Sequence, residues 1–177
     1  TKAATAKKVT PLPYKVISEN PEIPQVVSPL LSISDLNKTN RSALVNLFCT
    51  TKGDGGLRPI TGSGMIIDSR GIILTNAHIG QYFLLESALP TRINCSVRTG
   101  SPAHTAYNAN LLYLSPEWVR KNYKNNTLST PTGTGENDFA FLYITSSTNS
   151  GEVLPSEFPF VSIDTNEDDI KTGSNVL

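Results

Sequence analysis

The most informative segment of the sequence runs from Gly62 to His78 and reads GSGMIIDSRGIILTNAH. Two short apolar runs flank the polar residues Asp68-Ser69-Arg70-Gly71, whose final glycine suits a tight reversal of the chain. Short apolar runs joined by such a reversal are typical of a β-hairpin. We therefore predict one strand over 62–67 and a second over 72–75, which is nearly all apolar and should be buried.

Other stretches show the period of two, or the short apolar run, that is typical of strands. By this criterion further strands are predicted at 43–50, 92–98, 139–144 and in a segment that ends with 110–114. Short helices are predicted at 34–42, within 80–88 and at 116–124. Six short strands without a regular strand–helix alternation predict an all-β protein built on a six-stranded antiparallel barrel.

The composition divides the chain into an arm, a barrel domain and a connection. Residues 1–33 contain repeated prolines, which predict an extended arm because proline removes backbone donors and disfavours helix in the residue before it. Residues 34–145 hold the predicted strands and form the barrel domain. Residues 146–177 are rich in acidic side chains without periodicity, which predicts a connecting segment.

The overall composition excludes several classes of function. The chain has 177 residues, with 15 Lys and Arg against 15 Asp and Glu, and a formal net charge of +0. A nucleic-acid partner is not expected, because phosphate binding needs a concentrated basic surface. No apolar run approaches the roughly 18 residues of a membrane-spanning helix, so no membrane span is predicted.

No cofactor or metal site is expected from the sequence. The two histidines and two cysteines do not match the spacing of a zinc site. The stretch Asp164-Thr165-Asn166-Glu167-Asp168 begins like a calcium-binding loop. However, Asp169 stands where that loop needs glycine, and Asn175 stands where it needs a bidentate glutamate. We interpret this stretch as part of the acidic connection.

Two polar residues at strand ends are candidate catalytic groups. His78 follows the strand predicted at 72–75, and Asp138 directly precedes the strand predicted at 139–144. Each alone is more often structural: a histidine hydrogen-bonded at a strand end, or a solvated aspartate that begins a strand. Together they suit general-base catalysis, because an imidazole can accept a proton at one nitrogen while a carboxylate holds the other.

The segments that contain these two residues resemble the histidine and aspartate regions of trypsin-like serine proteases. Residues 62–79 are similar to the bacterial HtrA/Deg type, in which a glycine-serine-glycine strand and a hairpin lead to a Thr-Asn-x-His motif. Residues 137–142, Asn-Asp-Phe-Ala-Phe-Leu, are similar to the aspartate motif of that family. The resemblance covers roughly 43–177 and implies the first Greek-key barrel of a double-barrel protease. It also implies that His78 is the general base and that Asp138 fixes its tautomer.

The resemblance implies that the rest of the active site lies elsewhere. The family's nucleophile belongs to a Gly-x-Ser-Gly motif in a second barrel, and the 177 residues contain no such motif. The stretch Gly62-Ser63-Gly64 precedes the histidine and lacks the flanking glycines, so we interpret it as a bend in a barrel strand. Residues 146–177 are then the expected connection to a second barrel and the start of that barrel.

On this interpretation the chain is the amino-terminal half of a serine endopeptidase domain that hydrolyses peptide bonds through an acyl-enzyme. The nucleophile, serine or cysteine, would come from sequence beyond Leu177. The expected partners are a polypeptide substrate and a C-terminal barrel from the same gene or an associated chain. We expect these 177 residues alone to be inactive. The alternative is a non-catalytic, degenerate protease-like barrel that acts as a binding module.

The two cysteines, Cys49 and Cys95, lie on the apolar faces of their predicted strands. The resemblance implies that these strands are neighbours in the barrel, which makes a disulfide between them geometrically plausible. Two packed thiols are equally compatible with the sequence. A disulfide would favour an extracytoplasmic location, in which the protein is secreted, periplasmic or tethered by a removed N-terminal segment.

Overall fold

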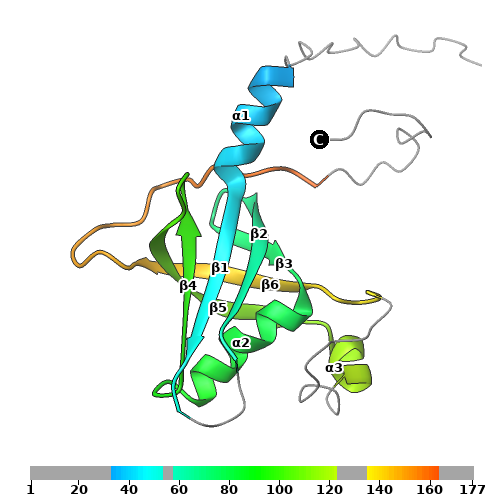
Figure 1. The fold of residues 1–177 in the computed structure, drawn as a ribbon. Helices are drawn as coiled ribbons and strands as arrows, with labels where there is room; N and C mark the ends of the chain where they lie inside the picture. Colours follow the sequence, from blue (N-terminus) through cyan, green and yellow to red (C-terminus); the bar gives the residue numbers. More distant parts are fainter. Residues whose placement is uncertain (1–32, 54–57, 123–134, 164–177) are drawn as a thin grey trace, which may run out of the picture. The chain divides into compact units, whose positions relative to one another are not determined.

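The centre of the molecule is a closed barrel of antiparallel strands with a few short helices around it (Figure 1). The structure is a computed structural model that describes residues 33–53, 58–122 and 135–163. The six strands are β1 (Leu44–Thr51), β2 (Ile60–Asp68), β3 (Ile72–Thr75), β4 (Ile93–Thr99), β5 (His104–Leu114) and β6 (Ala140–Ser147). They pair in the order β1-β2-β3-β6-β5-β4, and the pairing of β4 with β1 closes the barrel. The prediction of a six-stranded antiparallel barrel is confirmed.

The barrel interior is built from the alternate residues that the period of two predicts. In β1, Val45, Leu47 and Cys49 are buried, and the residues between them are partly exposed. In β4, Ile93 and Val97 are buried in the same cluster. Each fully buried aliphatic side chain of this kind contributes about 1.5–3 kcal/mol of transfer free energy. The inward faces of the strands therefore form the hydrophobic core of the barrel.

The reversal between β2 and β3 forms where the sequence predicts it. The amide of Gly71 donates to the carbonyl of Asp68 at 2.9 Å, and Gly71 has a φ of 87°, which glycine adopts without a steric penalty. The side chain and the backbone amide of Arg70 both donate to the carboxylate of Asp68. These hydrogen bonds lower the pKa of Asp68 to about 2.

The helices are α1 (Ile33–Ala43), α2 (Ala77–Ala88) and α3 (Pro116–Asn122). The predicted boundaries of α1 and α2 are wrong. Ala43, predicted as the first residue of a strand, is instead the last residue of α1, although it is fully buried as expected. Helix α2 begins at Ala77 rather than at Gly80, because the carbonyl of Asn76 accepts the helical hydrogen bonds from residues 79 and 80. Among the described residues, none of the helices has the length and apolar character needed to cross a membrane.

The chain that follows β6 packs back onto the barrel. Strand β6 continues to Ser147, past the boundary predicted at 145. Further on, the amide of Phe158 donates to the carbonyl of Ser69 at 2.8 Å, and the Phe158 ring is buried in the core. The amide of Val161 donates to the carbonyl of Ile66 at 2.9 Å. The described part of the predicted connection therefore belongs to the barrel domain, and the arm at 1–32 and residues 164–177 lie outside the described residues.

The two cysteines form a disulfide across neighbouring strands. Cys49 and Cys95 are directly opposite each other in the register of β1 and β4, with their Cα atoms 4.0 Å apart. Both cysteines of this disulfide are almost fully buried. Of the two alternatives that the sequence leaves open, the structure has the disulfide.

We expect reduction of this disulfide to destabilise the 177-residue chain by about 2–4 kcal/mol, because the bond restricts the unfolded chain across a separation of 46 residues. Urea unfolding with and without reductant would measure the difference. The variant Cys49→Ala/Cys95→Ala is the control, because reductant should leave its unfolding midpoint unchanged. Equal midpoints for the wild-type chain under both conditions would contradict the prediction.

Candidate active site

The pairing of β3 with β6 creates the candidate site. Thr75, the last residue of β3, is opposite Ala140, the first residue of β6. Because the strands are antiparallel, the chain that leaves β3 and the chain that enters β6 meet at the same end of the barrel. His78 lies just after the first strand and Asp138 just before the second, so the pairing brings together side chains that are 60 residues apart.

His78 and Asp138 are in direct contact through two hydrogen bonds. Nδ1 of the imidazole lies 2.8 Å from Oδ2 of Asp138, and the backbone amide of His78 donates to Oδ1 at 3.0 Å. An ionised carboxylate only accepts hydrogen bonds, so this contact requires the ring proton on Nδ1. The other ring nitrogen, Nε2, then carries the lone pair that can accept a proton. The structure thus brings together the two predicted site residues.

The two side chains differ in their exposure to solvent. The imidazole is 37% exposed, whereas the carboxylate is only 16% exposed. A partly buried carboxylate that accepts two hydrogen bonds from the same residue holds the ring in one orientation. The more exposed imidazole remains accessible to a reacting group. This arrangement matches the chemical requirement for a general base and its orienting partner.

Asp138 also provides the cap that helix α2 lacks. Asn76 is the N-cap residue of α2, but its side chain makes no capping hydrogen bond. The amide of His78, in the first turn, is satisfied instead by the carboxylate of Asp138. A negative charge at a helix N-terminus is favourable by about 0.3–1 kcal/mol, because the first amides of the helix point toward it. The same carboxylate therefore stabilises the helix and orients the ring that the helix carries.

A tight turn fixes the position of Asp138. Asn137 has a φ of 59°, in the left-handed region that asparagine tolerates better than most residues. The amide of Asp138 donates to the carbonyl of Gly135 at 3.2 Å, and the amide of Phe139 donates to the carbonyl of Asn137 at 2.9 Å. The chain therefore reverses immediately before β6, which directs the Asp138 side chain toward α2.

A glycine allows α2 to approach β6 closely. A Cβ atom placed on Gly80 would lie only 2.5 Å from the Cβ of Ala140, which is fully buried. Because neither backbone-attached atom can rotate away, only glycine at position 80 permits this separation. Gly80 is part of the helix that carries His78, and Ala140 follows Asp138 by two residues. Their contact therefore sets the distance between the two halves of the site.

The far end of α2 is attached to β4 by a carboxylate. Oε1 of Glu86 accepts a hydrogen bond from the backbone amide of Cys95 at 2.9 Å. Burial raises the pKa of Glu86, and the hydrogen bond from the Cys95 amide opposes part of that rise. Helix α2 is thus connected to β6 near its start and to the disulfide-bonded strand near its end.

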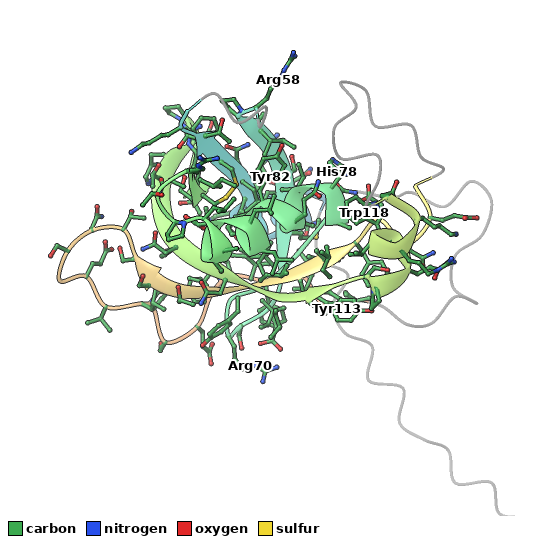
Figure 2. The ribbon with its side chains drawn as sticks, turned by 90° about the horizontal axis from the view of Figure 1, so that it is seen from below. Arg58, Arg70, His78, Tyr82, Tyr113 and Trp118 are labelled. Carbon is green, nitrogen blue, oxygen red and sulfur yellow. A yellow bond between two sulfur atoms is a disulfide. The ribbon has the colours of Figure 1, made fainter. Side chains whose placement is uncertain are left out.

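A groove of about 610 Å³ lies elsewhere on the molecule, on the outer face of the sheet. It is lined by Asp68, Arg70, Ile72, Leu112, Phe141 and Tyr143. Next to it, the rings of Tyr113, Phe139 and Phe141 contact one another, with centroids 5.8–6.0 Å apart. In Figure 2, Arg70 and Tyr113 project from the opposite side of the molecule to His78. This groove is therefore separate from the His78–Asp138 pair.

The residues that the structure describes include no group of three or more His, Cys, Asp or Glu side chains arranged to hold a metal ion. The acidic stretch that begins at Asp164 lies outside the described residues. No protein-family model matches the chain, and no curated protein matches it.

The sequence predicts His78 and Asp138 as site residues but assigns no role to the residues that position them. Asn76, Gly80 and Glu86 all contribute contacts that place α2. Asn76 had a recognisable signal, because asparagine is a preferred residue immediately before a helix. Gly80 and Glu86 had none, because their roles depend on contacts with strands that are distant in the sequence.

We expect Gly80→Ala to destabilise the chain by about 1–3 kcal/mol, because the added methyl group must push α2 away from Ala140. Urea unfolding would measure the loss, and the His78 ring signals in NMR spectra would report the disturbed contact with Asp138. The double variant Gly80→Ala/Ala140→Gly is the matched control, because it removes the opposing methyl group. If the change in the free energy of unfolding of the double variant equals the sum of the changes in the two single variants, the contact between positions 80 and 140 does not cause the destabilisation.

Glu86→Gln tests the buried carboxylate at the other end of α2. The amide oxygen of glutamine can still accept the hydrogen bond from Cys95, but it carries no charge. The pKa of Glu86 is raised in the folded chain. The contribution of this side chain to stability is therefore complete below its ordinary pKa of 4.5, and it decreases as the pH rises through the pKa of the folded state.

The two proteins should therefore be equally stable at about pH 4, and the variant should be the more stable at pH 7. Thermal unfolding at a series of pH values would measure this difference. Glu117→Gln is a suitable control, because Arg120 lowers the pKa of Glu117 and the dependence on pH should have the opposite sign. If Glu86→Gln were less stable than wild type at pH 7, the pKa of Glu86 would not be raised in the folded chain.

Proposed function

We propose that this chain supplies the general base and the orienting aspartate of a trypsin-like serine endopeptidase, similar to the HtrA/Deg type. The single observation that carries the proposal is the pair of hydrogen bonds that joins Asp138 to both the ring and the backbone amide of His78. A structural histidine at a strand end needs one partner for its ring. It does not need a carboxylate that contacts both the ring and the backbone amide in the first turn of the helix.

The strand order gives the proposal further support. The chain runs through β1, β2 and β3 in sequence, and β6 pairs with β3 while β4 pairs with β1. This order fits the Greek-key connectivity expected for the first barrel of the family. The proposed site also lies at the end of the barrel, on the segments that enter and leave strands, where such an enzyme places these residues.

In the proposed reaction, Nε2 of His78 takes the proton from a nucleophilic serine as the serine oxygen attacks the carbonyl carbon of a polypeptide. Asp138 stabilises the imidazolium that forms, without itself becoming protonated. The imidazolium then gives its proton to the leaving amine as the peptide bond breaks, which leaves an acyl-enzyme. Water, activated by the same nitrogen, hydrolyses the ester and restores the enzyme.

The nucleophile and the donors for the oxyanion would come from a second barrel, in sequence beyond Leu177 or on an associated chain. This assignment follows from the absence of a Gly-x-Ser-Gly motif in the 177 residues. The disulfide between Cys49 and Cys95 supports an extracytoplasmic location, since disulfides persist in oxidising compartments.

The experiment is to treat the full-length protein with a fluorophosphonate, which labels an activated serine. Wild type should be labelled and should hydrolyse peptides. Asp138→Asn should lower kcat by roughly 10⁴-fold, because asparagine no longer selects the imidazole tautomer with its proton on Nδ1. His78→Ala should lower kcat at least as much. His104→Ala is the matched control, because His104 begins β5 and its imidazole packs beside Gly100.

Two outcomes would contradict the proposal. Full-length wild-type protein that is neither labelled nor active would favour the non-catalytic binding module. Labelling by a thiol-specific alkylating agent in place of the fluorophosphonate would identify a cysteine nucleophile. The 177-residue chain alone should hydrolyse nothing, because it lacks the nucleophile and the oxyanion donors.

A further inference from the structure

Asn76 occupies the N-cap position of α2 but uses its side chain for a different purpose. Its carbonyl accepts the helical hydrogen bonds from Ile79 at 3.1 Å and from Gly80 at 2.9 Å. An N-cap side chain normally accepts a hydrogen bond from one of the first amides of the helix. Here the side chain makes no such bond, and the amide of His78 donates to Asp138 instead.

The Asn76 side chain donates across the site to Asp138. Its Nδ2 lies 3.2 Å from the backbone carbonyl of Asp138 and 3.4 Å from the carboxylate oxygen Oδ2. Oδ2 is also the oxygen that faces Nδ1 of His78. One amide group of Asn76 therefore contacts both the backbone and the functional oxygen of the aspartate.

We propose that Asn76 is a positioning residue that keeps Oδ2 of Asp138 directed at the His78 ring and so maintains the proton on Nδ1. This inference rests on the proposed function, in which that tautomer leaves Nε2 free to accept the proton. A neutral imidazole exchanges between two tautomers unless a fixed partner selects one. The Asn76 amide fixes that partner.

The structure gives a physical reason why Asp138 needs this contact. The aspartate lies in a tight turn after a left-handed asparagine, before β6 begins at Ala140. The hydrogen bonds within this turn involve the backbone and leave the carboxylate group free to rotate about its own bonds. The hydrogen bonds from Asn76 and His78 hold it from two directions.

The test compares Asn76→Ala with Asn76→Ser in the 177-residue chain. Serine is as favourable as asparagine at an N-cap, whereas alanine is unfavourable there. Neither serine nor alanine has the side-chain amide group of asparagine. Long-range proton–nitrogen NMR spectra of the His78 ring at neutral pH would report which nitrogen carries the proton. In wild type we expect the proton on Nδ1. In both variants we expect the population of the Nε2-protonated tautomer to rise several-fold.

Asn108→Ala is the matched control, because Asn108 also donates through its amide, to Ser146 at 2.9 Å on the barrel surface. It should leave the His78 spectrum unchanged. Ring spectra identical to wild type in both Asn76 variants would overturn the proposal. So would a serine variant that behaves as wild type while the alanine variant does not, since that pattern indicates only a helix cap. A wild-type ring with its proton on Nε2 would overturn it as well.

A second measurement separates this inference from the proposed function. In the full-length protein, Asn76→Ser should lower kcat by up to about 10²-fold with KM little changed, because a misplaced base slows the chemical step without altering substrate binding. If wild type proves inactive, the proposed function fails, while the NMR comparison still reports whether Asn76 positions the ring. If wild type is active and the variants match it in both measurements, only the role of Asn76 fails.

Discussion

The antiparallel pairing of β3 with β6 is the constraint on which the candidate site depends. With Thr75 opposite Ala140, the first residues beyond both strands must lie at one end of the barrel. The hydrogen bonds of a ladder fix this register, and a shift of one residue would move every inward side chain to the outer face. The buried cluster inside the barrel therefore stabilises the register of β3 with β6, and this register places His78 near Asp138.

Helix α2 converts this register into the contact between His78 and Asp138. It begins directly after β3, and the amide of His78 in its first turn is satisfied by Asp138 and not by the side chain of its own N-cap residue. Gly80 lets the helix lie close to β6, and Glu86 attaches its far end to the amide of Cys95. The contacts that hold the helix in place are therefore also the contacts that orient the His78 ring.

Much of the barrel could be predicted from the sequence because burial imposes a period of two on strands. The alternation around Cys49 and Cys95 predicts which residues face inward, and the structure buries both. Helix boundaries were predicted less well. Asn76 is a favourable residue before a helix, but the apolar pattern does not place the start of α2 at Ala77, because the amide of His78 in its first turn is satisfied by Asp138, which is distant in the sequence. The sequence also does not place Ala43 correctly, because a buried alanine fits either the end of a helix or the start of a strand.

Local sequence patterns predict the six strands, the reversal at 68–71 and the two candidate catalytic residues. These features depend on local periodicity, turn chemistry and residue type. The disulfide and the contacts of Asp138 with both the ring and the amide of His78 become visible only in the folded barrel. The same is true of the Asn76 side chain, which turns away from its own helix. The physical reason is that each of these contacts joins residues brought together by strand pairing, and strand pairing depends on the whole barrel.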